Sequence, residues 1–340
     1  MQNRHIVASA RGGPEALRVA EDPAPSPGPG EALVRVTAAG VSYGDVLQLA
    51  GVIPGTPKPP YVPGYDITGV VAEVGPGVDG VAPGQPVTAL VREGGYASLA
   101  SVPADRLVPV PPGTEDVPVA GAVLNYFIAY QMLHRVARAQ PGQHVLVHGA
   151  AGGVGIAVLQ LCRLAGIECH GTASAGKHPV VREHGGHPID YRKEDFALVA
   201  RDLPAGGFDA VLDPIGGYEH WRRSYIALRK GGILIAYGQN AALRDGKARS
   251  LEGAIGFLGG LVVPKLIPDG KSTIFYNAWS LEKSHPEAYR EDLSEVLWLL
   301  ANGEVKPVID QTLPLPEAAR AHELLEERKV VGKIVLTVGD

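Results

Sequence analysis

One short segment, residues 144–155, constrains the fold of this chain more than any other part of the sequence. A strand with an apolar centre, HVLVH, runs into the glycine-rich turn GAAGGVG, and the apolar helical run IAVLQLCRLAG follows directly. In the pattern G/A-x-G-x-x-G, the turn places small residues at Ala150, Gly152 and Gly155. Such a turn lets a pyrophosphate approach the backbone and lets the helix pack closely on the strand. The segment therefore predicts a dinucleotide-binding fold, in which the helix N-terminus attracts the phosphates.

The chain on the C-terminal side of this turn alternates apolar strands with helical stretches. The strand-like runs are IECHGTA, PIDY, FDAVLD, GGILIAYG and GKSTIFYNAW. Alternation of this kind is typical of a parallel, doubly wound sheet that helices cover on both faces. We therefore expect an α/β fold with a Rossmann dinucleotide-binding domain at residues 127–278.

The first 120 residues have a different pattern, in which short runs of alternating apolar residues lie between turn residues. Turn signals about every 8–12 residues are typical of an antiparallel, β-rich module. After residue 278 the chain gives two amphipathic helical stretches and a last strand, GKIVLTV. We therefore expect a second, β-rich domain that both chain ends form together, from residues 1–126 and 279–340.

Composition and charge exclude several classes of protein. The formal net charge is −5 and no long run of one sign occurs, so no nucleic-acid partner is expected. No stretch reaches the roughly 18–20 apolar residues that a transmembrane helix needs. The first residues lack the apolar core of a secretory signal, and the chain has only two cysteines. A disulfide framework is therefore not expected, and a cytoplasmic location is.

The residues at the end of the second strand in the Rossmann pattern indicate whether such a fold binds NADH or NADPH. An acidic side chain at this place would hydrogen-bond the ribose 2′-hydroxyl group of NADH. This chain instead has GTASAGK, with Ser174 and then Lys177. A hydroxyl group and an ammonium group suit the dianionic 2′-phosphate of NADPH, which a carboxylate would repel. We expect NADPH as the cofactor; the alternative is that Lys177 is an ordinary solvated residue in the first turn of a helix.

The motifs LNYFIAY, VLVHGAAGGVG, GTASAGKH, HPIDY and LDPIGG resemble, in residues and in order, a known family. It is the zinc-independent quinone oxidoreductase branch of the medium-chain dehydrogenase/reductase superfamily, and within it the vesicle amine transport protein-like members. The resemblance covers nearly the whole chain. It implies a Rossmann domain together with a GroES-like, β-rich catalytic domain. We also expect a homodimer, and a small-molecule substrate that is a quinone or an enone.

The resemblance further implies which residues contact the cofactor. Those at the pyrophosphate are Gly152, Gly153, Val154 and Gly155. Those around the adenosine phosphate are Ser174, Lys177 and Tyr191. The others are Gly238 near the nicotinamide, Asn125 at the start of the active-site helix, and Phe275 on the last strand of the Rossmann sheet.

The zinc enzymes of the superfamily resemble this chain at G-V-S-x-x-D and G-Y-D-x-x-G, but the residues that bind their zinc differ here. Ser42 stands where they have a cysteine, Tyr65 where they have a histidine, and Leu124 near a second cysteine. Serine, tyrosine and leucine cannot form a catalytic zinc site. Two histidine pairs lack further ligands at suitable spacing, namely His144 with His148 and His184 with His187. We therefore expect no metal site.

The expected reaction follows from the missing zinc. Without a metal to polarise a carbonyl group, hydride must go to a carbon that is already electron-poor. The site still needs a donor to the developing oxyanion. Tyr43 is the candidate, because related enoyl reductases have a tyrosine in a similar setting; the alternative is that Tyr43 only lines the pocket. Ile53 and Ser42 depart from the quinone oxidoreductase pattern, which leaves open a cofactor-binding but weakly catalytic module associated with lipid.

Residues 252–267 form an apolar stretch that glycines interrupt. The stretch is too short to span a membrane. It is either a lid over the substrate or a contact between subunits, and the sequence leaves both open. A contact with a lipid surface is less favoured, because few basic residues flank the stretch.

Overall fold

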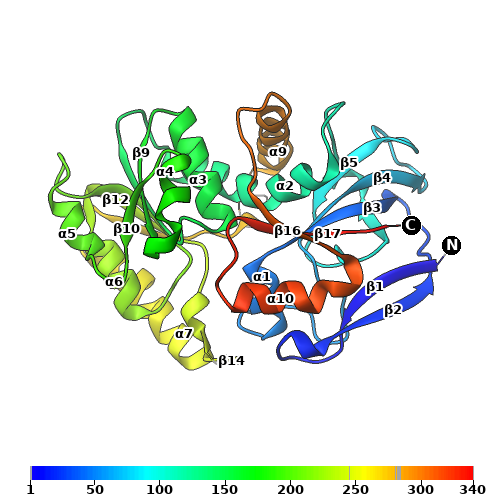
Figure 1. Ribbon diagram of the computed structural model, residues 1–340, viewed down its shortest axis with the longest axis horizontal. Helices are drawn as coiled ribbons and strands as arrows, with labels where there is room; N and C mark the ends of the chain where they lie inside the picture. Colours follow the sequence, from blue (N-terminus) through cyan, green and yellow to red (C-terminus); the bar gives the residue numbers. More distant parts are fainter. Residues whose placement is uncertain (1, 245, 280, 282–284, 340) are drawn as a thin grey trace. The chain divides into compact units, whose positions relative to one another are not determined.

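The computed structural model describes residues 2–244, 246–279, 281 and 285–339, and the chain forms two compact units (Figure 1). The first unit contains Met1–Phe127 and Glu287–Asp340, so both ends of the chain contribute to it. The second unit is the continuous segment Ile128–Pro286. The assignment of cofactor binding to one unit and catalysis to the other stays a prediction.

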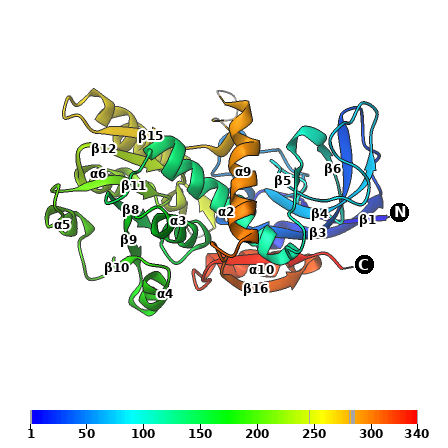
Figure 2. The same cartoon turned by 90° about the horizontal axis from the view of Figure 1, so that it is seen from above.

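Within the described residues, the second unit has a six-stranded sheet with the order β10-β9-β8-β11-β12-β15, which the labels in Figure 2 follow. Each neighbouring pair is parallel. The strands are β8 His144–His148, β9 Glu168–Ala173, β10 His187–Asp190, β11 Phe208–Asp213, β12 Leu228–Ala236 and β15 Ser272–Phe275. This strand order is that of a Rossmann fold. The expected α/β fold with a parallel, doubly wound sheet is confirmed.

Helices connect the strands of this sheet and bury its apolar side chains. They are α3 Gly153–Leu164, α4 His178–Glu183, α5 Phe196–Arg201, α6 Tyr218–Ile226 and α7 Ser250–Phe257. Shorter elements are η4 Ala175–Lys177, η5 Asn240–Ala242, η6 Leu258–Val262, η7 Val263–Leu266, β13 Leu243–Arg244 and β14 Lys247–Ala248. Phe208 of β11, Trp221 of α6 and Leu234 of β12 lie together in the core, each without exposed surface. A strand that is covered on both faces is expected to be rich in apolar residues, as FDAVLD of β11 and the ILIA end of β12 are.

Within the described residues, the first unit has a seven-stranded sheet with the order β16-β17-β3-β4-β5-β7, and β6 also pairs with β3. The strands are β3 Glu31–Val41, β4 Asp66–Val74, β5 Pro86–Leu90, β6 Leu99–Pro103, β7 Val108–Pro109, β16 Ile309–Pro314 and β17 Lys333–Thr337. β17 runs antiparallel to β3, with Ile334 opposite Val41. The last strand of the chain therefore completes a sheet that begins near residue 31, which confirms a β-rich domain made from both ends.

Other elements complete the first unit. β1 Gln2–Ala8 and β2 Leu17–Pro23 form an antiparallel pair that the sequence pattern did not indicate. The helices are α1 Tyr43–Leu49, α2 Asp116–Tyr130, α9 Pro286–Ala301 and α10 Ala318–Glu326, with the short turns η1 Pro14–Ala16, η2 Ala104–Arg106 and η8 Leu315–Glu317. α2 continues as the π-helical turn η3 Gln131–Ala137 and so crosses the division between the units. None of the described helices has the length and apolar character needed to cross a bilayer.

Candidate active site

The residues that we expect to contact the cofactor mostly follow strands that end at one edge of the second unit's sheet. In the parallel register, His148 of β8 lies opposite Thr172 of β9, and Asp190 of β10 lies opposite Ala173. The segments after β8, β9 and β10 therefore leave the sheet at the same edge. Open α/β sheets bind ligands at the carboxyl edge where the strand order reverses, which here is between β8 and β11.

The glycine-rich turn after β8 has the geometry that a dinucleotide site needs. Gly149 has a φ of +71°, a left-handed conformation that favours glycine. A Cβ atom on Gly155 would lie 2.5 Å from the carbonyl oxygen of Gly149, so only glycine allows α3 to pack this closely. At Gly152 the nearest atom to such a Cβ is 3.4 Å away, which leaves that face of the turn open. The left-handed turn residue is thus Gly149, whereas Ala150 is fully buried.

The first turn of α3 directs backbone N–H groups out of its N-terminus. The N–H group of Gly152 donates to the carbonyl oxygen of Gly149 at 3.0 Å, so the turn itself uses it. The next three N–H groups have no acceptor within the helix, because no helical carbonyl group precedes them by four residues. They belong to Gly153, Val154 and Gly155. Together with the helix dipole, these three groups can hold a negatively charged phosphate.

Polar residues gather where β9 and β10 end. Ser174 directly follows β9 and is half-buried, and its carbonyl oxygen accepts the N–H of Lys177 at 2.8 Å in the turn η4. Tyr191 directly follows β10 and is 55% exposed. The guanidinium group of Arg192 lies 5.7 Å from the centre of the Tyr191 ring. Arg192, the second residue after β10, was not among the residues expected from the sequence to contact the cofactor.

The other three residues expected to contact the cofactor lie in different surroundings. A Cβ on Gly238 would lie 2.7 Å from the carbonyl oxygen of Pro214, so glycine lets the loops after β11 and β12 approach each other. Phe275 ends β15, and its ring centre lies 5.7 Å from that of Phe257 in α7. Asn125 belongs to α2 in the first unit and is buried, and its Nδ2 atom donates to the carbonyl oxygen of Gly121 at 3.4 Å.

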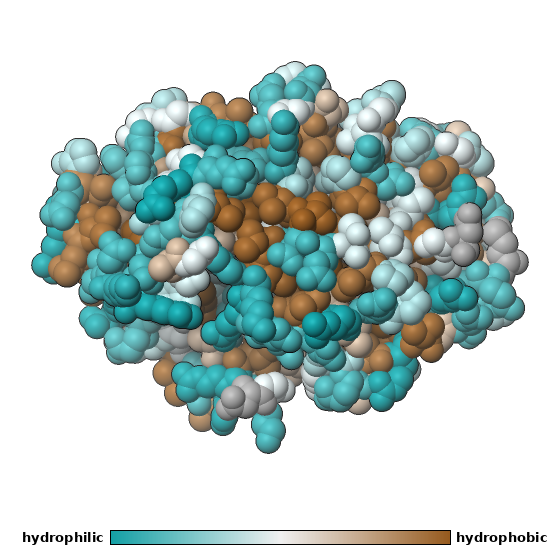
Figure 3. All heavy atoms as spheres, in the orientation of Figure 1, coloured by the Kyte–Doolittle hydropathy of each residue, from teal (hydrophilic) through white to brown (hydrophobic). Residues whose placement is uncertain are grey.

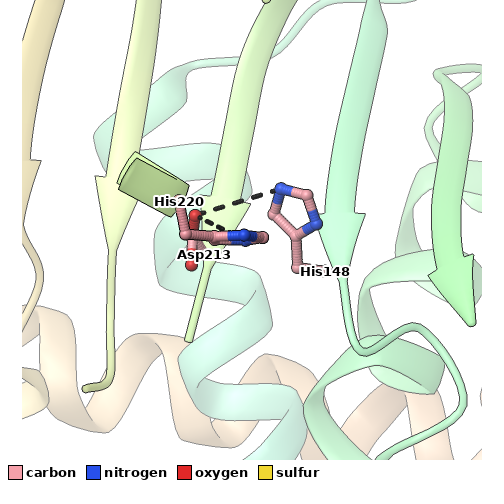
Figure 4. A group of neighbouring side chains, drawn as sticks. All are labelled: His148, Asp213 and His220. Carbon is pink, nitrogen blue, oxygen red and sulfur yellow. Dashed lines mark ion pairs between the residues drawn. The ribbon is translucent and has the colours of Figure 1, made fainter. Parts of the chain in front are cut away.

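A buried polar cluster at the ends of β8 and β11 was not foreseen from the sequence (Figure 4). The Asp213 Oδ2 atom lies 3.9 Å from His148 Nε2 and 3.3 Å from His220 Nε2. Ser224 donates its hydroxyl hydrogen to the same carboxylate oxygen at 2.7 Å. Burial lowers the pKa of His148 to about 3, so its imidazole is neutral at ordinary pH. The spacing of histidines along the chain could not indicate this group, because its members come from three separate elements.

In the first unit, the start of α1 carries the candidate proton donor. Tyr43 is the first residue of the helix and is half-buried. Burial raises the pKa of the Tyr43 hydroxyl, while a hydrogen bond with the Arg328 side chain and the charge of that group oppose the rise. The phenol therefore keeps its proton at neutral pH and can donate it, and Arg328 can stabilise the phenolate that donation leaves.

The residues that we expect at the family's zinc positions are poor ligands for a zinc ion. The Ser42 hydroxyl donates to Asp45 Oδ2 at 2.7 Å and accepts the N–H of Asp45, so it caps α1. Burial raises the pKa of the Tyr65 phenol well above its usual value, which keeps its oxygen protonated. Leu124 is buried and offers no ligand atom. Zinc prefers thiolate, imidazole and carboxylate ligands, and none of these three side chains is one.

Asp45 and Asp66 both have structural partners. Both carboxyl groups are fully buried. Lys333 on β17 forms an ion pair with Asp66 at 3.4 Å, and the N–H of Gly40 donates to the other Asp66 oxygen at 2.5 Å. Burial raises the pKa of Asp45 to about 6, although hydrogen bonds from Ser42 oppose the rise. These contacts tie β4 to β3 and β17, and the Ser42–Asp45 pair caps the start of α1.

Comparison with known protein families gives two matches along the chain. Residues 28–112 match the family described as the alcohol dehydrogenase GroES-like domain. Residues 185–336 match the family described as zinc-binding dehydrogenase. The first match lies in the β-rich unit that contains α1, so the expected GroES-like domain is confirmed.

Two curated relatives align with almost the whole chain. The synaptic vesicle membrane protein VAT-1 homolog of Rattus norvegicus is 32% identical over 99% of this chain and 84% of its own length. The 2-haloacrylate reductase of a Burkholderia species is 33% identical over 97% of both chains.

Solved structures agree with this relationship. A quinone oxidoreductase of Pseudomonas syringae is 26% identical, covers 98% of this chain and 99% of its own, and superposes with a TM-score of 0.86. A mycobacterial protein solved in complex with NADPH is 27% identical at the same coverages, with a TM-score of 0.84. The chain therefore belongs to the medium-chain dehydrogenase/reductase superfamily and is an oxidoreductase related to the VAT-1 homologues and the quinone oxidoreductases.

Proposed function

We propose that this chain is an NADPH-dependent reductase that transfers hydride, without zinc, to a quinone or to the activated double bond of an enone. The observation that carries this proposal is a contrast between two sites. The second unit has an open glycine turn for a dinucleotide, whereas Ser42, Tyr65 and Leu124 occupy the zinc positions in the first unit. Without a Lewis acid, a hydride acceptor must already be electron-poor. The names of the Burkholderia and Pseudomonas relatives agree with acceptors of this kind.

The proposal gives each residue at the sheet edge a task. The N–H groups of Gly153, Val154 and Gly155 hold the pyrophosphate, and Gly152 leaves room for it to approach. Gly238, Asn125 and Phe275 complete the cofactor contacts. When bound, the cofactor supplies the hydride. The residues of the chain orient it and exclude water from it.

The preference for NADPH rests on the residues after β9 and β10. Ser174 and Lys177 follow β9, where an NADH-specific site would have an acidic residue. Tyr191 emerges beside them, with the Arg192 guanidinium group over its ring. A hydroxyl and two cations at one edge suit a 2′-phosphate. The NADPH complex of the mycobacterial relative supports the same choice.

Tyr43 is the proposed proton donor. Its proton goes from the phenol oxygen to the oxyanion or enolate that hydride addition generates on the substrate. The hydrogen bond with Arg328 lowers the cost of the phenolate that this transfer leaves. If Tyr43 only lines the pocket, water or a backbone N–H group takes over this role.

We further propose that the protein is a homodimer in which the second unit carries the contact. β15 is the last strand of its sheet in the described part of the chain, and an edge strand can pair with another chain. Beside it, apolar side chains of α7, η6 and η7 are exposed, namely Leu251, Ile255, Leu258, Val262, Val263, Leu266 and Ile267. Figure 3 shows hydrophobic residues at the lower left of the drawn face, over α7. An exposed apolar patch of this kind marks an interaction site.

The same patch favours a second candidate function, a cofactor-binding protein that associates with lipid and catalyses weakly. The name of the rat relative, a vesicle membrane protein, agrees with this candidate. Arg249 precedes the patch and Lys265 lies within it near its C-terminal end, and basic residues there would suit anionic headgroups. Sedimentation with anionic vesicles, with negligible turnover on every acceptor, would favour it.

The deciding experiment measures NADPH oxidation by the full chain with a panel of quinones and enones, and NADP+ reduction with simple alcohols, both with and without a chelator. We expect turnover on at least one quinone or enone, no oxidation of simple alcohols, and the same rates with the chelator. Loss of turnover on chelation, restored by zinc, would refute the zinc-free mechanism. Absence of turnover on the whole panel would refute the reductase.

A further inference from the structure

Three side chains that commonly bind metals converge at the carboxyl ends of β8 and β11, in the second unit (Figure 4). His148 ends β8, Asp213 ends β11, and His220 belongs to α6. One ligand atom of each lies within 4.8 Å of those of the other two. Among the described residues, this is the one group of three or more histidine, cysteine or acidic side chains with that spacing.

The ligand atoms lie close to one another. The Asp213 Oδ2 atom lies 3.3 Å from His220 Nε2 and 3.9 Å from His148 Nε2. Bonds of about 2.0–2.2 Å to one tetrahedral zinc ion place ligand atoms about 3.3–3.6 Å apart. The Asp213–His220 distance fits as it stands, and the Asp213–His148 distance exceeds this range by only a few tenths of an ångström.

The atoms of His148 and Asp213 that do not belong to the group of three ligand atoms have neighbours of their own, as in a metal site. His148 Nδ1 lies 3.0 Å from the Thr172 hydroxyl oxygen, so a hydrogen bond at this nitrogen can fix the ring. The other Asp213 oxygen accepts the N–H groups of Ile215 and Gly216 at 2.8 and 3.3 Å. Partners of this kind orient ligating histidines and carboxylates.

Without a metal, one member of the group is left unsatisfied. The Ser224 hydroxyl donates to Asp213 Oδ2 at 2.7 Å and lies 3.2 Å from His148 Nε2, which satisfies those two residues. His220 Nε2 is buried and makes no hydrogen bond, although the Asp213 oxygen is only 3.3 Å away. A ring nitrogen that is close to a carboxylate but not aligned for a hydrogen bond is typical of two ligands that point at a third atom.

We propose that His148, Asp213 and His220 bind one divalent cation of the zinc type, with the Ser224 oxygen or water as a fourth ligand. The site lies in the second unit, whereas the zinc positions of the family lie in the first. Its role is structural. It ties β8, β11 and α6 together next to Gly149, where the glycine turn begins. The proposal does not depend on the substrate or on the reaction.

The test measures metal binding to the full chain, first with Zn²⁺ and then with Co²⁺, whose visible absorption reports the coordination. We expect one tightly held Zn²⁺ per chain after gel filtration, and a rise in Tm of about 5 °C or more when free Zn²⁺ exceeds Kd roughly 100-fold. His220→Ala and His220→Gln should each weaken Zn²⁺ binding at least about 100-fold and abolish the Co²⁺ spectrum.

His187→Ala is the matched control, because His187 is an exposed histidine of the same unit that pairs with Glu168. This variant should bind Zn²⁺ as the wild type does. The proposal is overturned if the wild type binds no more Zn²⁺ than His220→Ala, or if His187→Ala removes the binding equally. Chelation that removes this zinc should lower Tm without abolishing turnover, which separates this site from the zinc-free mechanism proposed above.

Discussion

Helices α1 and α3 each begin at a proposed functional segment, one in each unit, but their N-termini are completed in different ways. At α1 the chain supplies its own acceptors, because Ser42 Oγ accepts the N–H of Asp45 and the Asp45 carboxylate accepts the N–H of Ser42. At α3 the capping residue is Gly152, which makes no side-chain hydrogen bond. At the start of α1, side chains therefore accept helix-terminal N–H groups, whereas at the start of α3 these groups are left for a ligand.

The comparison teaches how to interpret a helix start in a sequence of this family. The run S-Y-G-D begins a closed terminus, in which the side chains of Ser42 and Asp45 cap the helix, so we expect function there to come from side chains such as that of Tyr43. The run G-G-V-G begins an open terminus, at which the backbone itself can bind an anion. Four predictions test this division of roles.

The largest expected effect is the loss of turnover in Tyr43→Phe, because this substitution removes the proton donor that we propose at the start of α1. Loss of a well-placed donor to an oxyanion lowers turnover by roughly 10²–10³-fold, while the NADPH Kd should stay unchanged. Steady-state rates on the best acceptor and fluorescence titration of NADPH measure the two quantities. Tyr61→Phe, which removes another buried hydroxyl of the first unit, is the control and should leave turnover unaffected. Near-normal turnover of Tyr43→Phe would assign Tyr43 to the pocket wall.

The next effect concerns the carboxylate that closes α1. Because the pKa of Asp45 is raised from 3.8 to about 6, the folded state binds its proton more tightly than the unfolded state does. The stability that this proton contributes is present at low pH and is lost as pH rises from about 4 to about 6, by roughly 3 kcal/mol. Between pH 4 and pH 7, the free energy of unfolding should therefore fall less in Asp45→Asn than in the wild type, and the difference between the two falls should be about this amount. Denaturant unfolding at both pH values measures it, and identical pH dependence of the two proteins would contradict the assignment.

Two glycines of the open terminus should separate stability from binding. Gly155→Ala places a Cβ atom 2.5 Å from a backbone oxygen, so it should destabilise the second unit by about 1–3 kcal/mol and weaken NADPH binding as well. Gly152→Ala meets nothing closer than 3.4 Å, so it should leave Tm unchanged while it weakens NADPH binding roughly 10-fold or more. Thermal unfolding and NADPH titration of both variants check this. Equal losses of Tm would show that Gly152 is there for packing.

Much of the second unit was predictable because its signals are local. An apolar strand, a glycine turn and a helix within residues 144–164 already specify the βαβ unit, and the following strands repeat the alternation. The first unit was harder. β16 has no buried residue and β2 has one, so neither carries the alternating pattern that marks a strand. β2 forms by pairing with β1, and β16 by pairing with β17.

The site shows the same limit of sequence reasoning. Ser174 and Lys177 could be proposed as cofactor contacts because they follow a recognisable strand, whereas Arg192 becomes relevant only when β10 is paired with β9. The His148, Asp213 and His220 group needs β8, β11 and α6 to be assembled, so its spacing of 65 and 7 residues has no meaning along the chain. Long-range packing, not local propensity, brings these residues together.

The most direct test of the central claim compares NADPH and NADH binding to the wild type and to Lys177→Ala. A charge-assisted contact with the 2′-phosphate contributes about 1.5–3 kcal/mol, which is a roughly 10- to 150-fold change in Kd. We expect the wild type to bind NADPH more tightly than NADH, and Lys177→Ala to weaken NADPH binding by that factor while NADH binding stays unchanged. Equal affinity of the wild type for both cofactors, or equal weakening of both by Lys177→Ala, would contradict the assignment of this edge to NADPH.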